Sequence, residues 1–154
     1  MGRLPYQVLA VLYLQDKSNI RYCVFGRNNP KGQFQFIAGG GEGNETPIQA
    51  VVREVFEESG ADNAEFQPLT SLCYIPTNIF PKEHREAWGE NIFVIPEYSF
   101  GVAIKSDHIQ LSEEHIGFRW ATYDEALSLL KWDSNKTALY ELNSKLTMAK
   151  SYNS

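Results

Sequence analysis

Three glutamates within one short segment are the residues of this sequence best suited to chemistry. Glu54, Glu57 and Glu58 stand at positions i, i+3 and i+4, a spacing that places their side chains on one side of an α-helix. Like charges placed this way repel each other, so an isolated helix gains nothing from them. A hard divalent cation removes the repulsion, because such cations prefer carboxylate oxygen ligands. The spacing therefore predicts a metal-binding helix face, and the alternative is an acidic surface helix without a ligand.

The residues around the glutamates predict where this helix begins and ends. Residues 46–49 read Thr-Pro-Ile-Gln, a capping box with proline at the first helical position, so the helix should begin at residue 46 or 47. Gly60 supplies a C-terminal stop. Before the helix, the glycine-rich run 39–43 lets the backbone approach a ligand closely and adopt positive φ angles. We expect an aliphatic stripe to pack on the core while the glutamates face a cleft; the stripe is Ile48, Val51, Val52 and Val55.

This stretch resembles the Nudix box, a motif of the form G-x5-E-x7-R-E-U-x-E-E-x-G-U in which U is a bulky aliphatic residue. The fixed positions are occupied by Gly39, Glu45, Arg53, Glu54, Glu57, Glu58 and Gly60. Two positions depart mildly from the pattern, because Ala61 replaces a larger aliphatic residue and Asn44 replaces a common glycine. The resemblance implies a Nudix-type α/β/α sandwich of the α+β class, with a mixed β-sheet between helices. It also implies hydrolysis of a nucleoside diphosphate linked to another group, with Mg2+ as cofactor and Mn2+ as a possible substitute.

The resemblance implies roles for the residues of the box. Glu54, Glu57 and Glu58 are expected to bind the metal directly or through water, with the Gly39 carbonyl as a fourth ligand. Two further residues, Arg53 and Glu45, are expected to orient these ligands rather than touch the metal.

The general base is left open between the box and a loop acid. Glu54 and Glu58 are the candidates within the box, and Glu114 is the candidate in the loop Ser-Glu-Glu-His at 112–115, with Glu113 as its rival. A solvated surface acid explains Glu114 equally well. We expect His115 to have a hydrogen-bonded structural role, with a proton shuttle as the alternative. His84 and His108 are expected to face solvent.

Aromatic residues are the candidates for recognising the non-phosphate part of a substrate. Stacking on such rings suits a pterin or a purine, although an aromatic residue more commonly belongs to the core. The candidates are Phe34, Tyr74, Phe80 and Trp88. Arg27, at the end of the second predicted strand, is a candidate phosphate contact, and a surface ion pair is the alternative.

Outside the box, two Nudix subfamilies are similar to this chain. Residues 111–120 resemble a segment shared by bacterial dihydroneopterin triphosphate pyrophosphohydrolases and diadenosine tetraphosphate hydrolases. Residues 132–138 resemble the Trp-Ser-Asn-Arg-x-Ala of the first subfamily, with one inserted residue and Lys136 in place of arginine. We therefore expect a pyrophosphohydrolase that acts on dihydroneopterin triphosphate or a purine nucleoside triphosphate. A dinucleoside polyphosphate hydrolase and a non-catalytic nucleotide-binding Nudix module are the alternatives.

Composition narrows the class of protein. With 154 residues and 43% apolar content, the chain is expected to form one domain over 1–154. No apolar run is long enough to span a bilayer and no secretion signal is recognisable, so we expect a cytoplasmic enzyme, monomeric or homodimeric. A net charge of −5 without basic clusters argues against polymeric nucleic acid and leaves a small nucleotide-like polyphosphate as the expected partner. Cys23 and Cys73 are expected to pack as small hydrophobic residues rather than form a bridge.

Hydrophobic periodicity predicts several strands and three helices. A hairpin is expected from strands at 7–14 and 20–26, followed by a loop at 27–32 and a short strand at 33–37. Pro68 in the strand at 65–75 indicates an edge or a bulge. Residues 76–96 are expected to form a long segment that exceeds the usual loop length and is either functional or mobile. The remaining expectations are strands at 98–104 and 118–121, a capping box that opens a helix at 122, and a helix at 135–146.

Overall fold

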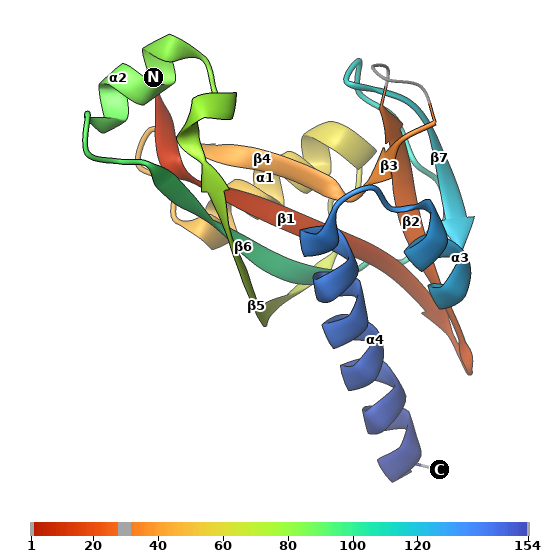
Figure 1. Ribbon diagram of the computed structural model, residues 1–154. Coiled ribbons are helices and arrows are strands. Elements are labelled where there is room, and N and C mark those ends of the chain that lie inside the picture. Colours follow the sequence, from red (N-terminus) through yellow and green to blue (C-terminus); the bar gives the residue numbers. More distant parts are fainter. Residues whose placement is uncertain (1, 28–31, 154) are drawn as a thin grey trace.

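Seven strands form one mixed β-sheet between helices in the part of the chain that the structure, a computed structural model, describes: residues 2–27 and 32–153 (Figure 1). The elements are β1 Arg3–Asp16, β2 Asn19–Arg27, β3 Phe34–Gln35, β4 Ile37–Glu42, α1 Pro47–Ser59, β5 Glu65–Pro76, η1 Thr77–Ile79, α2 Lys82–Trp88, β6 Val94–Ala103, β7 His115–Ala121, α3 Tyr123–Leu129 and α4 Asp133–Asn153. The strand order is β3-β2-β1-β6-β5, and β4 pairs with β1 while β7 pairs with β2. This arrangement confirms the predicted α+β class with a mixed sheet between helices.

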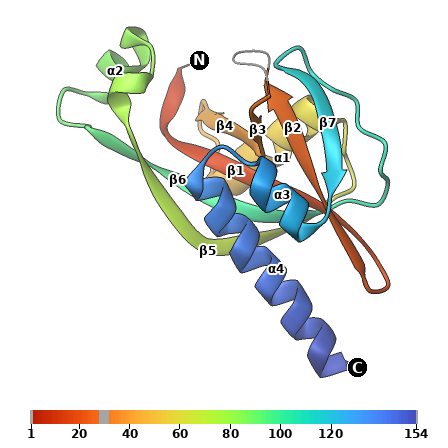
Figure 2. The ribbon, with the colours of Figure 1, turned by 45° about the vertical axis from the view of Figure 1, so that its right-hand side comes forward.

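β1 is the central strand, and its alternating side chains supply both cores. Val8, Ala10 and Leu12 are buried beneath α1, whereas Leu9 and Val11 are buried beneath α3 and α4. Figure 2 shows α1 behind the sheet and α3 and α4 in front of it. A run of buried apolar residues in β1 is what a strand covered on both faces requires. The three layers therefore follow from the apolar run that the sequence places at 7–14.

The pairing of β1 places three residues in one row across the sheet. β1 pairs in parallel with β6 and antiparallel with β4, and Gln7 is the partner of Glu97 on one side and of Gly40 on the other. Residues paired this way project from the same face of the sheet. The predicted hairpin of β1 and β2 is confirmed by antiparallel pairing from Tyr13 with Tyr22 to Asp16 with Asn19.

Helix α1 begins and ends where the sequence predicts. Thr46 caps it in a complete capping box with Gln49, and Gly60 closes it in the left-handed conformation at φ 79°. The predicted apolar stripe is only half correct, because Ile48 and Val52 are exposed. The buried side of the helix instead carries acids as well as aliphatic residues: Ala50, Val51, Glu54, Val55, Glu58 and Ser59.

Other boundaries differ from the sequence-based expectations. The segment 76–96 contains η1 and α2, and β6 begins at Val94 rather than at 98. Gly39, Gly40 and Gly41 lie in strand β4, and the positive φ angle falls at Gly43 instead. The prediction from Pro68 is confirmed, since β5 is an edge strand with a register shift after that residue. β7 begins at His115 rather than at 118, and α4 begins at Asp133 rather than at 135. The capping box at 122 is confirmed. Residues 28–31 of the loop predicted at 27–32 lie outside the described residues.

Helix α4 is fastened to the irregular part of β5 by one carboxylate. Glu141 accepts hydrogen bonds from the backbone N–H groups of Thr70 and Ser71, both at 2.7 Å, and pairs with Lys145 at 3.0 Å. Burial acts to raise the pKa of Glu141, but hydrogen bonds from Ser71, Thr70 and Lys145 outweigh it and lower the pKa to about 2.

Among the described residues, no helix is both long and apolar enough to cross a membrane.

We expect Glu141→Gln to lower the free energy of unfolding by about 2 kcal/mol at pH 7, because hydrogen bonds to a charged acceptor are lost. The folded pKa of about 2 lies below the ordinary value of 4.5 for a glutamate, so the contribution is complete above pH 4.5 and disappears as the pH falls through 2. Urea unfolding of both proteins between pH 7 and pH 2 measures the difference. An equal difference at every pH would contradict the assigned role of the charge.

Candidate active site

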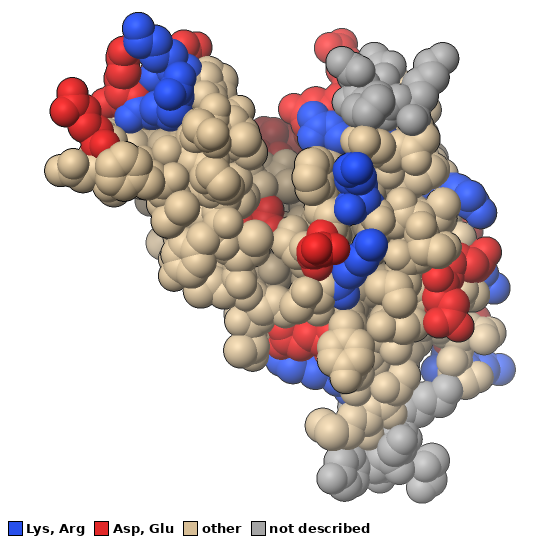
Figure 3. Space-filling view, in the orientation of Figure 1, with Lys and Arg blue, Asp and Glu red and all other residues tan. Residues whose placement is uncertain are grey.

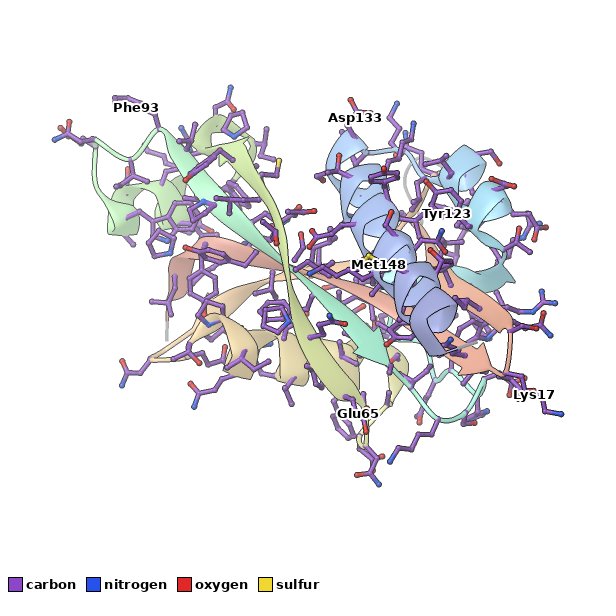
Figure 4. The ribbon with its side chains drawn as sticks, turned by 90° about the horizontal axis from the view of Figure 1, so that it is seen from below. Lys17, Glu65, Phe93, Tyr123, Asp133 and Met148 are labelled. Carbon is purple, nitrogen blue, oxygen red and sulfur yellow. The ribbon has the colours of Figure 1, made fainter. Side chains whose placement is uncertain are left out.

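A cavity of about 980 Å3 opens on the α4 face of the sheet. Its lining residues come from strands β1 to β6, from α1, η1 and α2, from the loop before β7, and from residues 132–135 around the start of α4. Figure 3 shows a hollow between the α2 end of the molecule and the end that carries β3 and β7, with acidic side chains at its floor. Figure 4 shows Asp133 at the start of α4 across from Phe93, which precedes β6.

Arg53 organises the acidic end of this site. Its guanidinium donates two hydrogen bonds to Glu45, at 2.8 and 2.9 Å, and one each to Glu54 at 3.0 Å, Glu57 at 3.1 Å and the Gly40 carbonyl at 2.9 Å. The hydrogen bonds to Glu45 are the main reason that the pKa of Arg53 is raised. One cation therefore fixes the turn before α1, the strand β4 and two carboxylates of the helix.

Gly39 and Glu54 form the point where α1 meets β4. The Glu54 carboxyl group lies directly against Gly39, so that a Cβ at this position would overlap the carboxyl atoms. This contact requires glycine although its backbone is extended. Burial raises the pKa of Glu54 to about 7, and the interactions with Arg53 only partly offset it because Glu57 and Glu58 oppose them. Glu54 thus has less positive charge beside it than a buried carboxylate needs.

Glu58 takes part in a different set of contacts. The Ser112 hydroxyl donates to its Oε2 at 2.6 Å, and the Nδ1 atom of His115 lies 2.9 Å from the same oxygen without the geometry of a hydrogen bond. His115 is buried against Phe25, and burial lowers its pKa. The burial of His115 fits a structural role, but its Nδ1 atom lacks a hydrogen-bond partner among the described residues, so the predicted hydrogen-bonded role stays a prediction. Its contact ties Glu58 to the loop that carries Glu114.

The three box glutamates do not converge on one point. Glu57 is exposed and bound to Arg53, Glu58 is turned to Ser112, and no group of three Asp, Glu, His or Cys side chains in the described ranges is close enough to hold a metal ion. The donor set nevertheless fits a hard divalent cation, since it offers carboxylates and a backbone carbonyl. The raised pKa of Glu54 points the same way, because a cation would stabilise its ionised form.

Arg3 forms the part of the cavity wall that lies against Gly40. Its guanidinium lies 4.6 Å from the centre of the Phe80 ring, and its Nη2 atom donates to Gln7 at 2.8 Å. Burial lowers the pKa of Arg3. Trp88 stands behind this pair, with its indole N–H bonded to the Arg3 carbonyl at 2.6 Å and its ring against Phe80. His84 stacks on Trp88 and lines the cavity, so the expectation that it simply faces solvent is wrong.

The structure brings some of the predicted site residues to the cavity and leaves others away from it. Arg27, Gly39, Glu54, Phe80 and Glu114 line the cavity, and so does Tyr74. Phe34 does not: it packs with the core beneath α3 and α4. Trp88 supports the wall without lining it. Several other residues lie outside the lining: Glu113, His108 and the box residues Glu45, Arg53, Glu57, Glu58 and Gly60.

Several lining residues were missed as functional candidates. Arg3, Gln7 and Glu97 were overlooked because each lies in or beside an apolar strand. The signal was available at Glu97, a charged residue at an inward position of a strand. Trp132, Ser134 and Asn135 belong to the segment that suggested a subfamily, but no contact was predicted for them. Asn135 is buried and accepts a hydrogen bond from the Phe36 N–H at 2.7 Å, which holds α4 against the sheet.

The chain is similar in sequence and fold to known proteins. The family described as NUDIX domain matches residues 4–142. A dihydroneopterin triphosphate diphosphatase of Haemophilus influenzae is 28% identical over 134 residues, which cover 86% of this chain and 83% of that protein. The crystal structure of a NUDIX hydrolase from Listeria monocytogenes is 36% identical with a TM-score of 0.83, covering 95% of this chain and 97% of that chain. An Ap4A hydrolase of C. elegans shares the fold with a TM-score of 0.72 at 15% identity, covering 94% and 98%.

We expect Glu54→Gln to stabilise the metal-free protein at high pH. The pKa of Glu54 rises from 4.5 to about 7, which corresponds to about 3 kcal/mol at roughly 1.4 kcal/mol per unit. The neutral acid is favoured in the folded state, so wild-type stability relative to the variant falls as the pH rises from 4.5 through 7. Unfolding in EDTA at pH 5 and pH 8 measures this change. A variant that is less stable than wild type at pH 8 would show that Arg53 compensates the buried charge fully.

Proposed function

The chain belongs to the Nudix family, whose members of this kind hydrolyse pyrophosphate bonds, and we propose that it is a pyrophosphohydrolase of a triphosphate carrying a pterin or purine. The resemblance of the box to this family is confirmed by the match over residues 4–142. The substrate proposal draws on the dihydroneopterin triphosphate diphosphatase relative, which covers 86% of this chain.

One observation carries the proposal: the acidic helix and the aromatic wall border the same cavity. Glu54 and Gly39 line one part of it, and Phe80, Tyr74 and Trp132 line another. A cavity of about 980 Å3 lies at the upper end of the range of about 300–1,000 Å3 that is usual for ligand pockets. A substrate with a polyphosphate at one end and a flat ring at the other matches this division.

Nudix hydrolases generally use divalent metal ions, and the box supplies the residues that would hold one here. We assign Glu54, Glu57, Glu58 and the Gly39 carbonyl as its ligands, with Mg2+ as the ion and Mn2+ as a substitute. When bound there, such an ion would neutralise phosphate charge and make a water molecule more acidic. Arg53 orients Glu54 and Glu57 through hydrogen bonds of 3.0 and 3.1 Å, and Glu45 orients Arg53. Arg3 and Arg27 also line the cavity and offer positive charge to the phosphates.

Glu114 is the general base that we favour outside the box. It lines the cavity, whereas its neighbour Glu113 does not. Its backbone N–H bonds to the Ser112 hydroxyl, which also bonds to Glu58. A base must lie within reach of the attacking water, and a position on the cavity wall satisfies this condition better than a position outside the cavity.

We expect the protein to release pyrophosphate from dihydroneopterin triphosphate or GTP in the presence of Mg2+, and EDTA to abolish the release. Glu57→Gln and Glu58→Gln should each lower kcat about a hundredfold or more, because both remove a negative ligand. Quantifying pyrophosphate and orthophosphate separately measures the reaction, and Glu65→Gln at the exposed start of β5 is the matched control. Full activity of Glu57→Gln would favour the alternative of an acidic surface helix without a ligand. Selective cleavage of dinucleoside polyphosphates would favour a dinucleoside polyphosphate hydrolase. Nucleotide binding without turnover would favour a non-catalytic module.

Exchanging the two loop acids separately distinguishes a base from a surface charge. Glu114→Gln should lower kcat about a hundredfold, because general-base catalysis contributes roughly this factor. Glu113→Gln should leave kcat unchanged, since this residue does not line the cavity. Steady-state rates from pH 5 to pH 9 give the comparison. Equal and small effects of both substitutions would return the role to Glu54 or Glu58.

A further inference from the structure

A buried carboxylate that plays no part in the hydrolytic end lies in the same cavity. Glu97, in β6, is only 3% exposed and lines the cavity. Its Oε2 accepts a hydrogen bond from Gln7 at 2.6 Å, while its Oε1 has no hydrogen-bond partner among the described residues. A buried acid is costly unless its oxygens receive hydrogen bonds. An unfilled acceptor on a carboxylate that lines a ligand cavity therefore points to a ligand donor.

Gln7 and Arg3 hold this carboxylate in a fixed orientation. Arg3 donates to the Gln7 side-chain oxygen at 2.8 Å, which obliges the Gln7 amide to present its NH2 group to Glu97. Ser134, at the start of α4, also interacts with the carboxyl group. Burial raises the pKa of Glu97 although Gln7 and Ser134 lower it, so a ligand that donates hydrogen bonds would stabilise the ionised form.

The position of Glu97 suits the ring end of the proposed substrate. Gly40, Gln7 and Glu97 form one row across β4, β1 and β6, so Glu97 lies two strand spacings, roughly 10 Å, from the glycines of the hydrolytic end. This separation is comparable to the span of a sugar or short linker plus a phosphate. Tyr74 and Trp132 line the same cavity with half of their surface or more exposed, and their rings can stack on a flat ligand.

We propose that Glu97 recognises the 2-amino-4-oxopyrimidine ring shared by pterin and guanine, by accepting hydrogen bonds from its ring N–H and its 2-amino group. This inference rests on the proposed function, because it names the substrate class of that same site. The two ligand donors are adjacent and parallel, and the two oxygens of a carboxylate match them. Adenine presents a ring nitrogen with a lone pair at the equivalent place, which an ionised carboxylate repels. Removing the 2-amino group leaves Oε1 without a donor.

The experiment compares GTP with ITP, which lacks only the 2-amino group. Wild-type kcat/KM should be about tenfold or more higher for GTP, since one hydrogen bond to a charged acceptor separates the two substrates. Glu97→Gln should bring this ratio close to one, because an amide cannot accept from both donors. Gln7→Met, which keeps the carboxylate but removes its orienting hydrogen bond, should also lower the ratio. Calorimetry with guanosine, inosine and neopterin in EDTA gives the same comparison without turnover.

Glu141→Gln is the matched control, because it removes a hydrogen-bonded carboxylate outside the cavity lining. It should lose stability and keep the wild-type ratio. Equal use and equal binding of the guanine and hypoxanthine ligands by wild type would overturn the proposal, as would a folded Glu97→Gln that keeps the wild-type preference. If wild type hydrolyses no triphosphate but binds guanosine over inosine in a Glu97-dependent way, the proposed function fails and this inference stands. Should Glu97→Gln not fold, Gln7→Met and the wild-type ligand series decide.

Discussion

Arg53 joins three segments whose relative positions define the acidic end of the cavity. Its fork of donors reaches Glu45 before α1, the Gly40 carbonyl in β4, and Glu54 and Glu57 on the helix. Guanidinium geometry is planar and fixed, so these acceptors must take compatible positions. Because Glu45 receives two of the hydrogen bonds, Glu54 and Glu57 share one nitrogen between them. The network thereby holds Glu54 and Glu57 in place and leaves them with excess negative charge. This charge serves no purpose in an apolar core, but it suits the binding of a divalent cation.

The same constraint explains why glycines and a raised pKa occur together. Glu54 must pass over β4 to reach the cavity, and it can do so because Gly39 has no side chain in its path. Gly40, on the other face, leaves space that the Arg3 guanidinium fills. The carboxylate and the guanidinium thus approach the cavity across adjacent glycines of one strand. Close packing of this kind removes water from Glu54, and burial is the main cause of its raised pKa.

Local signals predicted the frame around this site, and long-range contacts account for what they missed. The caps of α1 at Thr46 and Gly60 depend on neighbouring residues, and the structure confirms them. The exposed faces of Ile48 and Val52 depend on how α1 sits on the sheet, which periodicity alone does not define. The spacing of the box identified the acids, but not the turning of Glu58 towards Ser112, 54 residues further along the chain. The prediction that Phe34 contacts the substrate failed for a related reason. An aromatic residue in the strand that leads to a glycine run fits a core and a cavity equally well.

The central position of β1 lets reaction class and substrate choice be encoded in different parts of the chain. Residues of the box lie on β4 and α1, whereas Gln7 and Glu97 lie on β1 and β6 and are absent from the motif. One strand pairs with both sides, so the distance between the two ends is set by strand spacing rather than by loops. If Glu97 recognises the ring as proposed, a change at position 97 alters the ring that fits without moving the acids of the box. For the same reason a motif in one segment predicts the class of reaction and is silent on the substrate, since only the folded sheet brings Gln7 and Glu97 into one row with the glycines.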